Sequence, residues 1–203
     1  MYLSTAVYWN DPRIHTFGNI GSSGALHASM SPLFTKMLDT VAYNGINLRE
    51  ELHSLIDETD RVVDFGCGTG LSTPFKNGII GIDTSNEMLS VARTINTYAT
   101  FVQGNAESWG DTQMADTVIV SFVFHEVPKK GRIRILENAQ RIAKKAVYVM
   151  DISPEYTPSK SMLIGEPFVI EYMRNIQSEM DMYGFVRTDI VPTRACLWSL
   201  RFS

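Results

Sequence analysis

The chain has 203 residues, of which 44% are hydrophobic and 20% charged, with a formal net charge of −4. This length and composition favour one soluble globular domain with a sizeable core. An acidic balance argues against sequence-independent nucleic-acid binding, which needs clustered lysine and arginine. No apolar run is long enough to cross a membrane, and the first residues lack the pattern of a signal peptide. The two cysteines lie in unrelated segments, and no Cys/His spacing predicts a metal site. We therefore expect a cytoplasmic protein with no nucleic-acid or membrane partner.

The first part of the chain, residues 1–58, is expected to form an N-terminal lid and helices. Residues 1–24 mix aromatic, charged and turn-forming residues, a pattern typical of either a frayed terminus or a lid over a site. Apolar spacing then predicts a helix over residues 25–43, interrupted or restarted at Ser31-Pro32 and ended by Asn44-Gly45. A second helix is predicted over residues 48–57.

Residues 59–203 alternate between apolar strand-like runs and helix-like segments. Strands are predicted at residues 61–65, 79–83, 99–103, 115–122 and 146–150. Helices are predicted within residues 71–78, after a cap at Thr84 or Ser85, over residues 131–143, and from Val169 to Met180. Two final strands, residues 185–191 and 196–202, are joined by a short turn and must be antiparallel. The order predicts an α/β fold in a single domain. Its doubly wound, mostly parallel seven-stranded sheet has helices on both faces, a C-terminal antiparallel hairpin and an insertion at residues 153–172.

A glycine-rich loop follows the first of these strands, in the run Asp64-Phe65-Gly66-Cys67-Gly68-Thr69-Gly70. Glycines there let the backbone turn sharply and let a ligand approach bare amides. The next strand ends at Asp83, whose carboxylate offers acceptors for two ribose hydroxyls. This pair predicts a nucleoside-containing cofactor at the carboxyl edge of the sheet. The glycine spacing differs from the dinucleotide fingerprint and disfavours NAD.

Two further segments complete the pattern: Gly104-Asn105-Ala106-Glu107 and the run from Ser121 to Pro128. Together with the glycine loop and Asp83, in this order, they resemble the class I S-adenosylmethionine-dependent methyltransferases of small-molecule type. The resemblance implies that S-adenosyl-L-methionine is the cofactor and that a small molecule, such as an amino acid, an amine or a carboxylate-bearing metabolite, accepts the methyl group. The alternatives are a protein or nucleic-acid acceptor, or a non-catalytic protein that binds S-adenosylmethionine. The oligomeric state is not indicated.

The same resemblance implies a set of cofactor-binding residues. They are Asp64, Gly66, Cys67, Gly68, Gly70, Asp83, Thr84, Met88, Asn105, Ala106, Glu107, Ser121 and Phe122. A core role for Met88 is an equal alternative. Asn105 stands where the family commonly has an aspartate, so that adenine selection rests either on Asn105 or on the amides around Ala106.

The acceptor is expected to bind outside these shared motifs, in the lid and the insertion. The candidate substrate-binding residues are Tyr8, Trp9, Arg13, His15, His27, Tyr156, Glu166 and Tyr172. Aromatic faces with carboxylates suit a cation, whereas Arg13 and Lys160 suit an anion, so an amino acid is an economical hypothesis. The candidate bases, for an acceptor that must lose a proton, are His125, Asp151 and His15. A structural role for His125 is the alternative.

Overall fold

The computed structural model of the chain describes Tyr8 and residues 21–202, apart from the side chains of Lys36, Leu38 and Asp39. Most of the predicted lid, including Trp9, Arg13 and His15, lies outside these residues. Across the part of the chain that is described, no helix combines the length and hydropathy needed to cross a bilayer.

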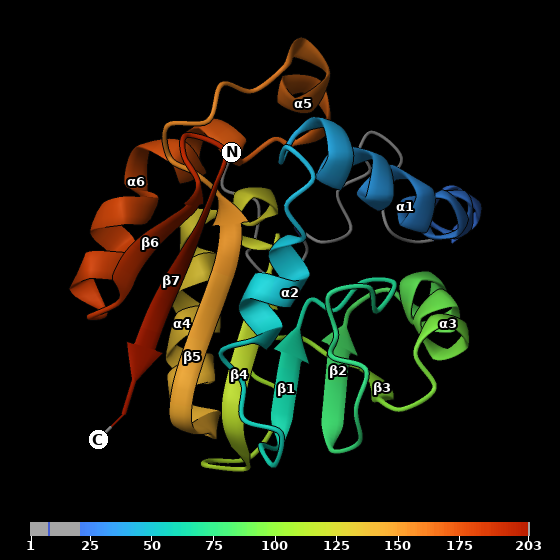
Figure 1. Cartoon of the computed structure of the whole chain (residues 1–203), viewed down its shortest axis with the longest axis vertical. Helices are drawn as coiled ribbons and strands as arrows, with labels where there is room; N and C mark the ends of the chain where they lie inside the picture. Colours follow the sequence, from blue (N-terminus) through green and yellow to red (C-terminus); the bar gives the residue numbers. More distant parts are fainter. Residues whose placement is uncertain (1–7, 9–20, 203) are drawn as a thin grey trace.

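A single seven-stranded sheet forms the centre of the molecule, with strand order β3-β2-β1-β4-β5-β7-β6 (Figure 1). The strands are β1 (Val62–Phe65), β2 (Ile79–Asp83), β3 (Thr100–Gln103), β4 (Ala115–Ser121), β5 (Ala143–Ile152), β6 (Val186–Val191) and β7 (Ala195–Arg201). The first five are parallel, and β7 runs antiparallel to both β5 and β6. The predicted fold class, including the C-terminal antiparallel hairpin, is confirmed.

Helices cover both faces of this sheet. They are α1 (Gly21–Val41), α2 (Leu48–His53), α3 (Asn86–Ile95), the 3-10 helix η2 (Phe124–Glu126), α4 (Lys129–Ile142), α5 (Lys160–Gly165) and α6 (Val169–Met182). On one face, Val63 of β1 belongs to the buried cluster that includes residues of α4 and α6. On the other face, Val62 shares a cluster with Leu48 and Leu52 of α2. Successive residues of a strand point to opposite faces, so a strand buried on both sides is apolar throughout.

The N-terminal helices differ from the prediction at their boundaries. The helix α1 begins at Gly21 and passes through Pro32 without a restart. A proline removes one intrahelical hydrogen bond but does not end this helix. The helix α2 begins where predicted, because the Asn47 side chain accepts from the amides of Arg49 and Glu50, but it ends at His53.

Residues 71–78, where a short helix was predicted, form an irregular loop instead. Distant side chains satisfy its carbonyl groups. The Asn96 amide nitrogen donates to the carbonyls of Thr73 and Pro74, and a ring nitrogen of His53 lies 2.8 Å from the carbonyl of Ser72. These partners replace the intrahelical bonds that a helix would have supplied.

Candidate functional site

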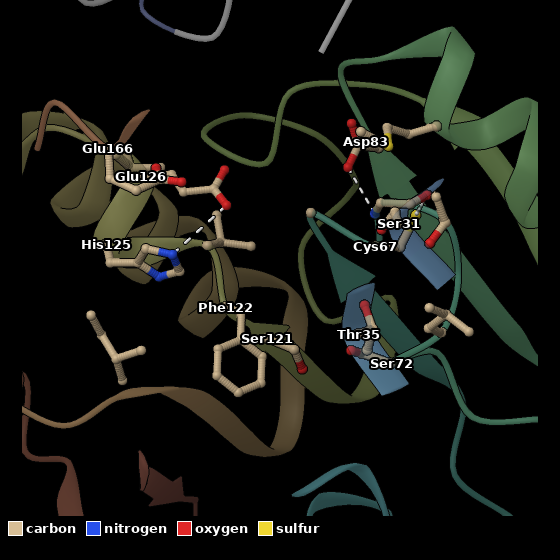
Figure 2. Close-up of a pocket in the computed structure, with 18 of the residues that line it drawn as sticks. Ser31, Thr35, Cys67, Ser72, Asp83, Ser121, Phe122, His125, Glu126 and Glu166 are labelled. Atoms are coloured by element: carbon tan, nitrogen blue, oxygen red, sulfur yellow. Dashed lines mark hydrogen bonds and ion pairs between the residues drawn. The ribbon is translucent and has the colours of Figure 1, made fainter. Parts of the chain in front are cut away.

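A cavity of about 640 Å³ lies at the carboxyl ends of the parallel strands, which is where open α/β sheets bind ligands. The glycine loop, the ends of β2 and β4, the helix α1 and the segment 152–166 all contribute to its lining. Figure 2 shows Asp83 and Cys67 on one side of this cavity and His125, Glu126 and Glu166 on the other. The two ends therefore differ in chemistry.

The glycine loop combines ligand exposure with close packing. Gly66, Gly68 and Gly70 all have positive φ, between 51° and 76°. A Cβ atom on Gly66 would lie 2.4 Å from a methyl group of Val123, so no larger residue fits there without movement. Gly66 and Gly68 line the cavity together with Cys67, whereas Gly70 packs against Phe101 and α3.

Asp83, at the end of β2, is hydrogen-bonded to the glycine loop. Its Oδ2 accepts a hydrogen bond from the amide of Gly68 at 2.9 Å, and its Oδ1 accepts from the amide of Ser85 at 2.9 Å. Burial raises the pKa of Asp83, although both amide hydrogen bonds oppose the shift. The carboxylate lies beside Thr84 and Met88 in the cavity lining, and each of its oxygens has a further lone pair.

Asp64 lies beneath the loop rather than in the cavity lining. It is completely buried, and its Oδ2 accepts a hydrogen bond from the Thr73 hydroxyl at 2.6 Å. Burial raises the pKa of Asp64 to about 7, with a further increase from the charge of Asp83. This position suits a residue that anchors the loop after β1.

The segment after β3 divides between the cavity and the protein interior. Asn105 and Ala106 line the cavity, and the Asn105 side-chain oxygen accepts from the amide of Glu107 at 2.9 Å. Glu107 is absent from the lining and instead accepts a hydrogen bond from Arg134 at 3.1 Å. Its position is that of a structural partner for α4.

The end of β4 brings two more predicted residues to the cavity, Ser121 and Phe122. Phe122 has a φ of 56°, a strained conformation for a bulky residue. Its amide donates to the carbonyl of Met150, and its ring stacks on Tyr43 at a centroid distance of 6.1 Å. These contacts hold the strained backbone at the mouth of the cavity.

His125 is held by a buried carboxylate from the neighbouring strand. The distance from its Nδ1 to Oδ1 of Asp151 is 2.6 Å, and its Nε2 lies 3.9 Å from Oε1 of Glu126. Burial by itself lowers the pKa of His125, but the charge and hydrogen bond of Asp151, with smaller contributions from Glu126 and Glu166, raise it to about 9. The ring is therefore an imidazolium at neutral pH.

Among the described residues, His125, Glu126 and Glu166 form the one group whose donor atoms, all within 4.8 Å of one another, match the spacing of metal ligands. Neighbouring residues supply two of the three, and the third comes from the insertion. The expectation from the sequence that the chain has no metal site therefore stays a prediction.

Some of the remaining candidate residues line the cavity and others are buried away from it. Tyr8, His27 and Tyr156 line the cavity. Tyr172 and Asp151 do not line it: both are completely buried, and the Tyr172 hydroxyl donates to the carbonyl of Ile152 at 2.6 Å. Tyr172 is thus a core residue whose ring edge supports His125.

Several residues that line the cavity were not predicted from the sequence, including Ser31 and Thr35 on α1. Together with His27 they are spaced four residues apart, which places them on one helix face. That spacing is the signal that could have found them. Arg49, Leu71 and Ser72 also line the cavity, but no sequence pattern sets them apart.

The fold is that of an open, mostly parallel α/β sheet with an antiparallel β7, and it carries a cavity at the carboxyl ends of the parallel strands. Residues 62–146 match the family model of a methyltransferase domain. The chain is 36% identical over 77 residues to a trans-aconitate 2-methyltransferase of Afipia carboxidovorans, covering 35% of this chain and 30% of that one. It is 34% identical over 79 residues to one of Rhodopseudomonas palustris, covering 36% and 31%. The alignments thus span less than a third of these relatives' length.

Solved structures share the fold over most of the chain. The complex of DhpI with SAH has a TM-score of 0.62 at 16% identity, covering 86% of this chain and 91% of that one. A SAM-dependent methyltransferase from Aquifex aeolicus has a TM-score of 0.59 at 17% identity, covering 85% and 98%. Residues 62–146 therefore match a methyltransferase domain, and the chain shares the fold of these solved structures, in agreement with the resemblance that the motifs indicated.

Proposed function

We propose that the chain transfers a methyl group from S-adenosylmethionine to a small molecule bound in the same cavity. The observation that carries this proposal is the single cavity with two different ends, Asp83 and the glycine loop at one and His125 with Glu166 at the other (Figure 2). A methyl donor and an acceptor bound in one cavity can be aligned for in-line displacement, which is the main requirement of this reaction.

The cofactor supplies an activated methyl group on sulfur when it is bound, so the protein's task is to bind and orient. In this proposal, the backbone of Gly66 to Gly68 lies against the amino-acid part of the cofactor, and Asp83 accepts from both ribose hydroxyls. The amides of Gly66 and Cys67 already donate to the carbonyl of Ile82, and that of Gly68 donates to Asp83, so the loop contributes close approach rather than free donors. Met88, Asn105 and Ala106 surround the adenine. The Asn105 oxygen accepts from the amide of Glu107 and keeps a second lone pair, so both this oxygen and the amides near Ala106 are candidates for adenine selection.

The acceptor end is built largely outside the matched domain. His27 comes from α1, and Tyr156 and Glu166 come from the segment between β5 and α6, all beyond residues 62–146. The acceptor named for the trans-aconitate relatives is therefore not carried over to this chain. A cavity of about 640 Å³ has the size of a small-molecule site, which favours a small molecule over a macromolecular acceptor.

Calorimetry with S-adenosylhomocysteine tests the donor site. We expect the wild-type chain to bind it and the Asp83→Asn variant to bind at least about tenfold more weakly, since a hydrogen bond to a charged group contributes roughly 1.5–3 kcal/mol. Asp111→Asn, at an exposed loop position, is the matched control and should bind like the wild type. Absence of heat with the wild-type chain, or equal affinity in Asp83→Asn, would contradict the proposal.

A further inference from the structure

We propose that His125 is the base that removes a proton from the acceptor and that Asp151 is its positioning residue. The acceptor is then an amine, a phenol or an alcohol, a nucleophile that must lose a proton on methylation. This inference rests on the proposed methyl transfer and adds a substrate class to it.

Asp151 is fixed from several sides. Its Oδ2 accepts from the amides of Phe124 at 2.8 Å and His125 at 3.3 Å, and its Oδ1 accepts from the amide of Ile152 at 2.7 Å. The same Oδ1 lies 2.6 Å from Nδ1 of His125. A carboxylate cannot donate, so Nδ1 must carry the hydrogen in this contact. The neutral ring therefore has its lone pair on Nε2.

The surroundings of Nε2 suit proton transfer at the cavity. His125 and the neighbouring Glu126 both line it, as does Glu166 from the segment after α5. From α6, the ring of Tyr172 packs edge-on against the imidazole at 6.3 Å. A histidine kept only to hold the turn would need Nδ1 alone, whereas Nε2 of this ring lies 3.9 Å from Oε1 of Glu126, another residue of the cavity lining.

The step balances with the groups present. The acceptor's lone pair forms a bond to the methyl carbon, the carbon–sulfur bond breaks, and its electron pair stays on the now neutral sulfur. The proton of the acceptor's N–H or O–H group passes to Nε2, and the resulting imidazolium later releases it to water. A thiolate or a carboxylate acceptor would need no such base.

Nitrogen NMR of the histidine-labelled chain, saturated with S-adenosylhomocysteine, tests the geometry without a known acceptor. Above the pKa of His125, we expect the neutral ring to carry its hydrogen on Nδ1. In Asp151→Asn we expect the pKa to fall toward the ordinary value of 6.5 and the hydrogen to lose its preference for Nδ1. A wild-type ring protonated on Nε2, or an unchanged pKa in Asp151→Asn, would overturn the assignment.

A panel of amines, phenols, alcohols, carboxylates and thiols, assayed with methyl-labelled S-adenosylmethionine, tests the substrate class. We expect label in an amine or a hydroxyl compound, and a loss of at least about a hundredfold in kcat for His125→Asn with SAH affinity retained. Because only the neutral ring accepts a proton, kcat of the wild type should rise with pH toward the pKa of His125, about 9. Asp111→Asn should match the wild type.

The outcomes separate the two proposals. Failure of SAH to bind the wild type would defeat the proposed function itself. SAH binding with label only in carboxylates or thiols, or full turnover in His125→Asn, would defeat the inference alone. If no panel compound is labelled, the position of the ring hydrogen decides. Repeating the active assays with EDTA separates a base from a metal ion held by the same group: lost turnover would overturn the assignment of His125 as base.

Discussion

Burial by itself shifts the pKa values of two titratable residues at this site in opposite directions: it raises that of Asp64 and lowers that of His125. Burial raises the pKa of Asp64 to about 7, because it disfavours the carboxylate. It disfavours the imidazolium of His125 as well, but Asp151 outweighs it and the pKa rises to about 9. The free energy of unfolding therefore falls as pH rises from 3.8 through 7, because over this range the Asp64 side chain ionises freely only in the unfolded chain. His125 stabilises the folded chain fully below pH 6.5, and this stabilisation is lost as pH rises through 9.

Replacing Asp64 with asparagine should change the pH dependence of stability. The asparagine side chain cannot ionise, and its oxygen can still accept from the Thr73 hydroxyl. We expect the free energy of unfolding of Asp64→Asn, relative to the wild type, to increase by about 1 kcal/mol or more between pH 5 and pH 8. Urea unfolding at the two pH values measures this. A constant or shrinking difference, against Asp111→Asn as control, would show that Asp64 is ionised in the native state.

At the scale of elements, a buried ion pair joins α4 to α6. The guanidinium of Arg132 donates through Nε and Nη2 to both carboxylate oxygens of Glu179, at 2.7 and 2.9 Å. Its Nη1 also donates to the carbonyl of Val127, which lies between η2 and α4. Both side chains are almost completely buried. Loss of Arg132 leaves the Glu179 carboxylate in the core without this cation, and loss of Glu179 leaves Arg132 only the partly exposed Glu171, 3.6 Å from its Nη1.

Single replacement of this pair should therefore cost more than double replacement. We expect Arg132→Leu and Glu179→Leu each to destabilise the chain by about 3–5 kcal/mol, and the double variant by clearly less than the sum. Urea unfolding of the four chains gives the coupling. Additive effects would indicate that the two residues do not depend on each other.

Periodicity predicted most elements to within a few residues, because strands buried on both faces are continuously apolar and helices repeat near 3.6 residues. It failed at residues 71–78, where the hydrogen-bond partners Asn96 and His53 are distant in sequence. It also failed at Tyr172, since an aromatic residue at a helical period looks the same whether it faces a ligand or the core.

At the scale of the molecule, the parallel strands explain why distant motifs meet. Their carboxyl ends share one edge of the sheet (Figure 1). The glycine loop, Asp83 and Ser121 therefore line one cavity. This part of the site followed from motif order. The acceptor end did not follow from motif order. Asp151 reaches His125 only because β4 pairs with β5, and α1 and the insertion pack over this edge through tertiary contacts.

The central claim is methyl transfer to a small molecule, and one measurement tests it most directly. The purified chain is incubated with methyl-labelled S-adenosylmethionine and a metabolite extract, and the products are analysed by mass spectrometry. We predict label in a small molecule with the wild-type chain and little or none with Asp83→Asn. No transferred label, or label found only in protein or RNA, would contradict the account.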